Sequence, residues 1–323
     1  MKGSQVRRAL SAAFALALAA TPMSSPARAD TKLAVGKAAL TSESNLAANV
    51  GAKTGIFKKH GLDVEVLDFA GGGKMIQALT AGSIDIGVGA GIQMAFIVKG
   101  APMLAVCEDA SVLPFVIGVP WDSPLKSLAE LRGKTIGISS AGSLTDWLAQ
   151  ELARTQGWKN DEITRVAIGS SPTASTAAFR LHRIDAYVGG TSTFLGMEEK
   201  KVGRALAPVS SYIPKIAAGT IFASTHLVES NPDAIRAFLA GWLETVRFMK
   251  THKAETVEIE RAVTGYSEAV SSRDYDLTIG YFTDDCRFDP ESLVTLKRSF
   301  LDMKLLDQPP DMSKLYSEAY LPK

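Results

Sequence analysis

The chain has 323 residues, of which 46% are hydrophobic and 21% charged, a balance typical of a globular protein with a sizeable core. Its formal net charge is +1, and without residues 1–29 it would carry 31 basic and 34 acidic residues. This near-neutral balance argues against nucleic acid or an anionic membrane as the main partner. The length favours two domains.

Residues 1–29 have the pattern of a cleaved secretory signal. Three basic residues precede an apolar stretch over residues 9–20, and Ala27 and Ala29 are the small residues that a signal peptidase needs. The alternative is a membrane anchor, but the apolar stretch is shorter than the roughly 20 residues that span a bilayer. No cysteine lies near the cleavage site, so no lipid can be attached there. We therefore expect a soluble periplasmic protein.

Strand and helix patterns alternate from the leader to residue 106. Leu46, Val50 and Phe57, for example, fall on one face of a helix that Gly61 ends. The order strand, helix, strand, helix predicts a parallel sheet covered by helices. The expected strands are 32–37, 64–69, 84–88 and 103–106, and the expected helices are 46–60, 74–81 and 93–98.

The same plan restarts after a strand over 115–119 and a break at Pro120–Pro124. The further expected strands are 135–139, 163–168, 184–188 and 220–224, and the expected helices are 143–156, 173–181, 194–200 and 233–250. The apolar face of the last helix suits the surface of the first sheet.

The predicted domain organisation is a signal peptide and two lobes. We expect the chain to cross between lobes near Gly118–Trp121 and again near Gly219–Ser224. The predicted segments are 1–29 for the signal peptide, 30–119 and 222–323 for lobe 1, and 120–221 for lobe 2.

A short phrase occurs twice, about 100 residues apart. The sequence Ile-Asp-x-x-Val-Gly stands at 84–89 and again at 184–189. The repeat predicts two lobes built on one plan, able to close on a small molecule. Asp85 and Asp185 have the same mid-strand context, so we interpret them as structural anchors rather than as a catalytic pair of carboxylates.

Four stretches, taken in order and spacing, resemble a known family. They are residues 52–65, the glycine-rich run from Gly71 to Gly87, residues 131–137, and Gly142-Ser143 opening a helix. The chain resembles the nitrate/sulfonate/taurine class of ABC-transporter solute-binding proteins, a branch of the type 2 periplasmic binding proteins.

The resemblance implies a two-lobed α/β fold in which each lobe is a mostly parallel sheet flanked by helices and two crossover strands join the lobes. It also implies a small-molecule ligand between the lobes, delivery to an ABC permease in the inner membrane, and a monomer without a cofactor. The class carries several kinds of ligand, so the resemblance does not identify the cargo.

The best candidate ligand contacts lie in the loop between the 135–139 strand and its helix. A helix N-terminus at the carboxyl end of a strand presents free N–H groups and suits an anion. Ser140, Ser143 and Thr145 add hydroxyl donors, and Gly142 allows close backbone approach. The alternative is a simple helix cap, with Ser143 bonded to its own backbone.

Equivalent loops in both lobes supply further candidates. Each contains glycine or hydroxyl residues where a strand turns into a helix, and each could equally be a tight turn that only needs glycine. These candidates are Gly72, Gly73, Lys74, Gly91, Ile92, Thr191, Ser192 and Thr193. Lys74 would pair with an acidic ligand or stay solvated.

Acidic and polar residues after two other strands suit a ligand with N–H donors. Ser42, Glu43 and Ser44 follow the first strand, and Asp109, next to Glu108, ends the strand that begins near 103. If these carboxylates face the ligand, a purely anionic cargo becomes less suitable than an amino-sulfonate or a ring with N–H groups. Glu43 could instead act as a favourable charge at a helix N-terminus.

The two cysteines, Cys107 and Cys286, are the only ones in the chain. They could form a disulfide in an oxidising compartment. They could equally be two buried thiols, because sequence alone does not fix connectivity.

Signatures of catalysis are missing from the sequence. It has no His-Glu-x-x-His, Cys-x-x-Cys or Gly-x-Ser-x-Gly motif, and its glycine loops lack a Gly-Lys-Ser/Thr ending. We expect no enzyme, no metal and no catalytic residue, and predict an importer subunit that binds a sulfonate, carboxylate or nitrate-like anion. The alternatives are a binder of a thiamine-type pyrimidine or related N-heterocycle, a pyrimidine-synthase-like enzyme, and a sensor that reports to a membrane receptor.

Overall fold

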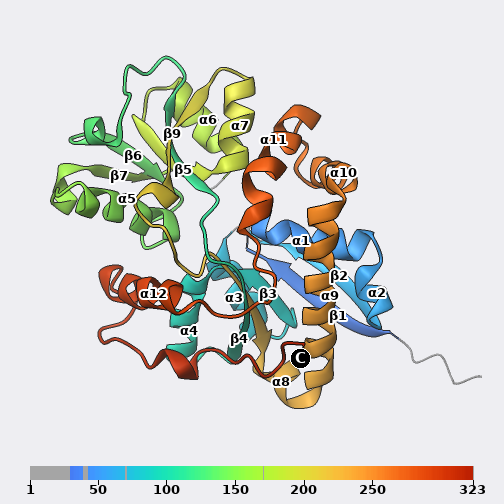
Figure 1. Cartoon of the computed structure of the whole chain (residues 1–323). Helices are drawn as coiled ribbons and strands as arrows, with labels where there is room; N and C mark the ends of the chain where they lie inside the picture. The colour runs from blue at the N-terminus through green and yellow to red at the C-terminus, as the bar shows by residue number, and fades with distance from the viewer. Residues whose placement is uncertain (1–29, 39–42, 70, 170, 323) are drawn as a thin grey trace, which may run out of the picture.

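The computed structural model describes residues 30–38, 43–69, 71–169 and 171–322 and contains two five-stranded sheets flanked by helices (Figure 1). This confirms the predicted two-lobed α/β architecture. We call the sheet that contains residues 31–37, with its helices, lobe 1, and the sheet that contains residues 135–138, with its helices, lobe 2. Figure 1 shows lobe 2, in green and yellow, above lobe 1, in blue and teal.

The sheet of lobe 1 has the strand order β2-β1-β3-β10-β4. Its strands are β1 (Thr31–Lys37), β2 (Leu62–Asp68), β3 (Ile86–Gly89), β4 (Met103–Ala110) and β10 (Gly219–Ser224). β1 pairs in parallel with β2 and β3, whereas β10 is antiparallel to both of its neighbours. The predicted parallel sheet is therefore interrupted by one antiparallel strand.

The sheet of lobe 2 repeats this arrangement with the order β7-β6-β8-β5-β9. Its strands are β5 (Phe115–Pro120), β6 (Thr135–Ile138), β7 (Thr164–Ala167), β8 (Ala186–Gly190) and β9 (Gly203–Pro208). β5 is the antiparallel member, between β8 and β9. Strand β9 was not predicted from the sequence, although it is the counterpart of β4 about 100 residues earlier.

Each antiparallel strand reaches its sheet from the other lobe. β5 follows β4 of lobe 1, and β10 follows β9 of lobe 2. The chain thus enters lobe 2 over residues 111–114, earlier than the crossing predicted near Gly118–Trp121, because β5 pairs along its length with β8 and β9. The return crossing ends where β10 begins, at Gly219, as expected.

The repeated aspartates tie the strands of each lobe together. The Asp85 carboxylate accepts a hydrogen bond from the Ala34 N–H at 2.8 Å, and the Asp85 N–H donates to the Ala34 carbonyl at 2.8 Å. Asp185 makes the same two bonds with Thr135, also at 2.8 Å. The interpretation of both residues as structural anchors is confirmed.

A glycine in β1 of lobe 1, and one in β6 of lobe 2, makes room for the isoleucine beside the anchor of that lobe. A Cβ on Gly36 would lie 2.5 Å from Ile84 Cδ1, and a Cβ on Gly137 would lie 2.7 Å from Ile184 Cδ1. Both distances are too short for real atoms. The repeated sequence motif therefore has the same packing in both lobes: its isoleucine fills the space beside a glycine of the neighbouring strand.

The helices follow the predicted order with one division. The expected helix over 46–60 is two helices, because Gly55 adopts a left-handed conformation with φ of 73° between them. The helices of the strand-and-helix plan are α1 (Glu43–Lys53), α2 (Ile56–Lys59), α3 (Gly72–Thr80), α4 (Met94–Val98), α5 (Leu144–Thr155), α6 (Pro172–Arg180) and α7 (Thr191–Glu199).

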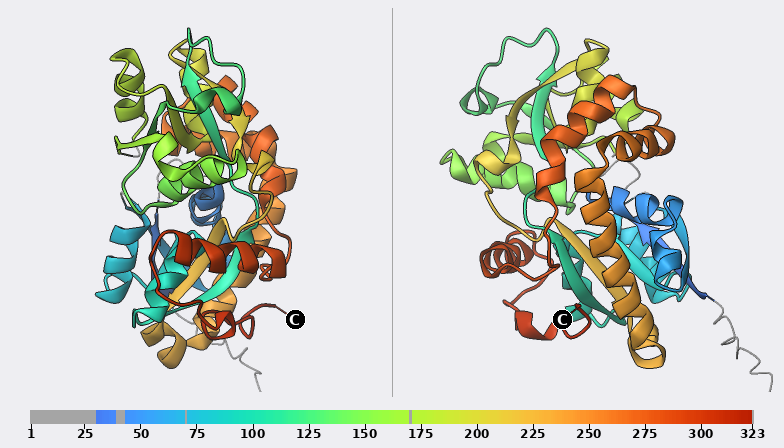
Figure 2. Two further views of the ribbon diagram at one scale, coloured as in Figure 1. Left: turned by 90° about the vertical axis from the view of Figure 1, so that its left-hand side faces the viewer. Right: turned by 45° about the vertical axis from the view of Figure 1, so that its right-hand side comes forward.

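The C-terminal part of the chain is helical and touches both lobes. Its helices are α8 (Thr225–Ser230), α9 (Pro232–Thr251), α10 (Lys253–Thr264), α11 (Glu268–Thr278) and α12 (Pro290–Asp302). α9 covers lobe 1 with a buried face that includes Ile235, Leu239 and Trp242, as predicted. α11 reaches α7 of lobe 2, where Arg273 donates to Glu198 at 3.0 Å, so the segment 222–323 does not contact lobe 1 alone (Figure 2).

A disulfide joins the C-terminal segment to the sheet of lobe 1. Cys107 in β4 is bonded to Cys286, which lies between α11 and α12, so the pairing left open by the sequence does form. The two residues are 179 positions apart. In the chain-entropy model a link of this length stabilises the folded state by up to about 5 kcal/mol. No helix of the described part of the chain has the length and apolar character that a membrane span needs.

Loss of one anchor should destabilise the protein. In an Asp185→Ala variant the Thr135 N–H loses its carboxylate acceptor, and we expect the free energy of unfolding to fall by about 1–3 kcal/mol. Urea denaturation followed by circular dichroism measures this change. Asp161→Ala, at an exposed position of the same lobe, is the control and should leave the midpoint nearly unchanged. Equal effects of the two substitutions would contradict the anchoring role.

Candidate functional site

The candidate site comprises the carboxyl ends of β1 and β3 in lobe 1 and of β6 and β8 in lobe 2. β2 and β3 lie on opposite sides of β1 in lobe 1, and β7 and β8 lie on opposite sides of β6 in lobe 2. A ligand crevice is expected where the strand order reverses in this way, at the carboxyl ends of the strands. Most residues predicted from the sequence follow one of these four strands. Ser42 lies outside the described residues, and Glu43 and Ser44 are described only as the first backbone positions of α1.

Three hydroxyl groups form a closed cluster at the start of α5. Ser139 Oγ donates to Ser143 Oγ at 2.9 Å, and Thr145 Oγ1 lies 2.8 Å from Ser139 Oγ and 2.9 Å from Ser143 Oγ. Ser143 also accepts from the N–H of Asp146 at 3.3 Å, so it caps the helix as the simpler interpretation predicted. Ser140 is the exposed hydroxyl of this loop.

An acidic side chain already occupies part of this helix N-terminus. Asp146, in the first turn of α5, accepts from the Gly142 N–H at 2.8 Å and from Arg165 Nη1 at 2.6 Å. Gly142 has φ of 72°, a conformation that glycine adopts without strain. The carboxylate therefore offsets the positive end of α5, while Arg165, which sequence reasoning missed, restores a cation beside it.

The start of α7 is bound to the first crossing between the lobes. The N–H and the hydroxyl of Thr191 both donate to the carbonyl of Pro114, at 2.9 and 3.1 Å. Ser192 and Thr193 are buried. This predicted loop therefore holds the start of β5 and α7 together. The N–H and the hydroxyl of Thr191 donate to the protein's own backbone.

The corresponding loop of lobe 1 is closely packed. Gly91 and Ile92 are buried in the short 3₁₀ helix η1 (Gly91–Gln93). A Cβ on Gly91 would lie 2.7 Å from Ala217 Cβ and 2.9 Å from Leu296 Cδ2. This glycine therefore permits the approach of the return crossing and of α12.

One of the two predicted glycines at the start of α3, Gly72, packs against a glutamine that was not predicted. Gly73 and Lys74 are exposed, whereas the Cα of Gly72 packs against the side-chain amide of Gln93. Gln93 Oε1 accepts from the Ala90 N–H at 2.6 Å. The only sequence signal was its position directly after Gly91-Ile92.

Glu108 and Asp109, the two acidic residues of β4, are both buried but have different neighbours. Glu108 is fully buried, and both its oxygens accept from Ser292 Oγ, at 2.7 and 2.8 Å. Burial raises the pKa of Glu108 to about 7, against the opposing effect of the Ser292 hydrogen bond. The predicted contact Asp109 is buried against Gly219, and within the described residues no other residue donates a hydrogen bond to its carboxylate. Burial raises the pKa of Asp109 well above its usual range.

A buried lysine lies at the carboxyl end of β1. Lys37 Nζ pairs with Asp68 at 3.0 Å and donates to Asn49 of α1 at 2.5 Å. Burial lowers the pKa of Lys37, and Asp68 counteracts this effect. Its burial could not be predicted from the sequence, because an isolated lysine at a strand end is usually exposed. It joins β1, β2 and α1 behind the site.

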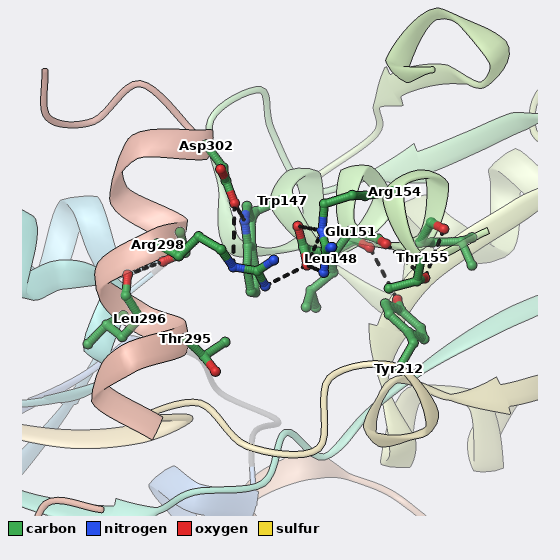
Figure 3. Close-up of polar contacts among 12 residues, drawn as sticks. Trp147, Leu148, Glu151, Arg154, Thr155, Tyr212, Thr295, Leu296, Arg298 and Asp302 are labelled. Carbon is green, nitrogen blue, oxygen red and sulfur yellow. Dashed lines mark hydrogen bonds and ion pairs between the residues drawn. The ribbon is translucent and has the colours of Figure 1, made fainter. Parts of the chain in front are cut away.

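A polar cluster connects α12 to α5 of lobe 2 (Figure 3). Glu151, whose side chain is 3% exposed, pairs with Arg154 at 2.8 Å and with Arg298 of α12 at 2.7 Å. Arg298 also lies over the ring of Trp147, whose Nε1 donates to Asp302 at 3.4 Å. We call these five residues the α5–α12 cluster.

The other end of α12 is fixed to lobe 1. Ser292, in its first turn, donates to Glu108 of β4, and Leu296 packs against the backbone of Gly91. Figures 1 and 2 show α12, in dark red, beneath α5. The helix is therefore a bridge between the lobes beside the two crossings. Within the described residues, no group of three or more His, Cys, Asp or Glu side chains is arranged to hold a metal ion.

Comparison with known proteins places this geometry in context. The family model described as NMT1/THI5 like matches residues 46–256. A Brucella abortus chain, provisionally named a binding protein, is 30% identical over 218 residues, which are 65% of each chain. The match thus spans about two thirds, and not the whole length, of that relative.

Several solved structures share the fold at low sequence identity. The ligand-binding component of an ABC-type import system from Staphylococcus aureus superposes with a TM-score of 0.75 and 18% identity, covering 90% of this chain and 98% of its own. The Escherichia coli periplasmic aliphatic sulphonate binding protein SsuA gives 0.73 and 20%, covering 88% and 92%. The desulfurization enzyme DSZB gives 0.66 and 14%, covering 89% and 97%.

The buried Glu108 should make stability depend on pH. Burial raises the pKa of its carboxyl from the ordinary value of 4.5 to about 7 in the folded protein. The folded state therefore holds the extra proton between these values, and the free energy of unfolding falls as pH rises through that window. We expect Glu108→Gln to remove about 2–3 kcal/mol of this fall.

Denaturation midpoints at pH 5 and pH 7.5 test this expectation. Glu65→Gln, at an exposed position of β2 in the same sheet, is the control and should keep the pH profile of the unaltered protein. Parallel profiles for Glu108→Gln and the unaltered protein would show that Glu108 is ionised in the folded state throughout this range.

Proposed function

Because this chain belongs to the NMT1/THI5-like family, we propose that it is the periplasmic ligand-binding subunit of an ABC importer. Its two lobes would close on a small organic anion of the sulfonate, carboxylate or nitrate type and deliver it to the membrane permease. The observation that carries the proposal is the pair of equivalent lobes with helix N-termini at the carboxyl ends of the strands. Such helix ends bind anions through free N–H groups and the helix dipole.

The connections between the lobes suit a closing motion. Within the described residues, two segments, 111–114 and 209–218, carry the chain between the sheets. Rotation about a few residues in such segments is the common mechanism of domain closure. A ligand stabilises the closed form by the difference between its affinities for the two forms. The α5–α12 cluster crosses the same junction, so its contacts must move with the lobes or break as they close.

The hydroxyl cluster favours binding over catalysis. A nucleophilic serine needs an adjacent base that accepts its proton. Ser139, Ser143 and Thr145 are instead hydrogen bonded to one another. The desulfurization enzyme has the same fold, so the fold alone does not separate the two activities. The likeness to the Escherichia coli sulphonate-binding protein supports a sulfonate among the candidate ligands.

Two features of the chain support export from the cytoplasm. Residues 1–29 have the composition of a signal peptide. The Cys107–Cys286 disulfide is of a kind that persists in oxidising compartments such as the periplasm. We propose that the mature protein begins at Asp30 and acts there as a monomer.

A thermal-shift screen tests the proposed ligand class. Protein freed of ligand by unfolding and refolding is heated with butanesulfonate, nitrate, benzoate, succinate or a thiamine-type pyrimidine. A ligand at 100 times its Kd adds about 2.7 kcal/mol. For a chain of this length that corresponds to a rise of roughly 5 °C in the melting temperature. We expect a shift with one anion class. A response to the pyrimidine alone would contradict the anion proposal.

Two variants of equal charge locate the site on lobe 2. Ser140→Glu adds a negative charge at the exposed start of α5, and Gln156→Glu adds the same charge at its other end. We expect Ser140→Glu to weaken binding of the responsive anion at least tenfold, because like charges repel near the helix N-terminus. Gln156→Glu should change the Kd less than twofold. Similar Kd values for the two variants would place the ligand elsewhere.

A further inference from the structure

We propose that Gln93 is the contact that lobe 1 makes with the anionic group of the ligand. Its side-chain amide and the first N–H groups of α3 would together donate hydrogen bonds to one oxyanion. The inference rests on the proposed function and deepens it, because it assigns the anion to a specific set of donors in lobe 1 that the sequence did not single out.

The orientation of the Gln93 amide follows from its surroundings. The Ala90 N–H donates to Oε1 at 2.6 Å, so the oxygen end of the amide is fixed toward the backbone of η1. The nitrogen end, Nε2, then lies against Gly72, the first residue of α3. Gln93 is 9% exposed, and no hydrogen bond from Nε2 occurs within the described residues. Nε2 keeps some contact with solvent, so this donor is open to a ligand that offers an acceptor.

Two glycines leave the space that this amide occupies. A Cβ on Gly89 would lie 2.7 Å from Gln93 Oε1, and a Cβ on Gly72 would collide with Nε2. Residues with side chains at either position would displace the amide from the start of α3. The end of β3, the start of α3 and η1 are thus built around one side chain.

The start of α3 also supplies unused backbone donors. The first N–H groups of a helix have no acceptor within the helix, and no hydrogen bond from the N–H of Gly72, Gly73 or Lys74 occurs within the described residues. α3 has nine residues and no acidic residue in its first turn. Its positive end is therefore not offset from within the helix, and the exposed Lys74 adds a cation beside it.

The contrast with the other helix ends favours α3. At α5 the Asp146 carboxylate already accepts from Gly142, and at α7 the Thr191 N–H and hydroxyl are bonded to Pro114. At α3, Nε2 lies against the first residue of the helix, and neither it nor the first backbone N–H groups have such a partner within the described residues. We assign the charged group of the ligand to α3 and its remaining part to the hydroxyl-rich loop of lobe 2.

The Gln93→Glu substitution tests this assignment directly. Glutamate has the same shape and keeps an oxygen to accept from the Ala90 N–H, but it replaces the Nε2 donor with a charged oxygen at the start of α3. Gln77→Glu, at an exposed position of the same helix, makes the same change of charge and is the matched control. Titration calorimetry measures the Kd of each variant for butanesulfonate, nitrate and benzoate.

We expect Gln93→Glu to weaken anion binding without lowering the melting temperature of the ligand-free protein. Gln93→Glu should bind the anion at least 30-fold more weakly than the unaltered protein, whereas Gln77→Glu should stay within twofold. Without ligand, Gln93→Glu should melt at the same or a higher temperature, because an acidic group is favourable at a helix N-terminus. This second readout separates a lost contact from a damaged fold.

The outcomes distinguish the two proposals. If the unaltered protein binds an anion and Gln93→Glu binds it equally well or more tightly, the assignment of Gln93 is wrong and the proposed function stands. If the unaltered protein binds none of the three anions but binds the pyrimidine, the proposed anion function fails and the assignment fails with it. If both glutamate variants lose affinity alike, the effect is one of overall charge, which also overturns the assignment.

Discussion

β10 lies antiparallel between β3 and β4 of lobe 1, and β5 lies antiparallel between β8 and β9 of lobe 2. Each inserted strand arrives from the opposite lobe, so backbone hydrogen bonds fix both ends of both crossings. Neither sheet is complete without the chain that returns from the other. This exchange holds the two sheets, and with them the helices that follow their strands, to one junction. The bridge made by α12 and the contact of α11 with α7 are additions to a junction that the strands already define.

Much of this architecture could be predicted because it is local or repeated. Alternating strand and helix patterns gave the parallel strands, and the repeated phrase around Asp85 and Asp185 indicated two similar lobes. The position of the first crossing was predicted too late, since the apolar run Phe115–Val119 suits the interior of either sheet and its sequence carries no mark of its partners. The sequence could not decide whether the two cysteines pair, because the approach of Cys286 to β4 depends on the path of the whole C-terminal segment.

The candidate site was less predictable than the fold. The capping role of Ser143 could be foreseen from a serine that opens a helix, but its bonds to Ser139 and Thr145 depend on the turn at Gly142. Asp109 is a candidate contact whose orientation the sequence leaves open, and in the structure it packs against Gly219 next to an irregular register of β4 and β10. Gln93 was missed because the position of its side-chain amide depends on Gly72, which is distant in sequence, as well as on the nearby Gly89. Long-range packing, rather than local pattern, decides which polar groups remain available.

The bond between Cys107 and Cys286 closes the chain into a covalent ring. All of lobe 2 and the helices α8 to α11 belong to that ring, while β1 to β3 and α12 lie on the two free arms. A stretching force applied to the chain ends passes through the sulfur atoms and bypasses the ring. Lobe 2 therefore bears no tension along its backbone, although its residues occupy the middle of the sequence. Cleavage of one peptide bond within the ring likewise opens it and leaves a single covalent molecule.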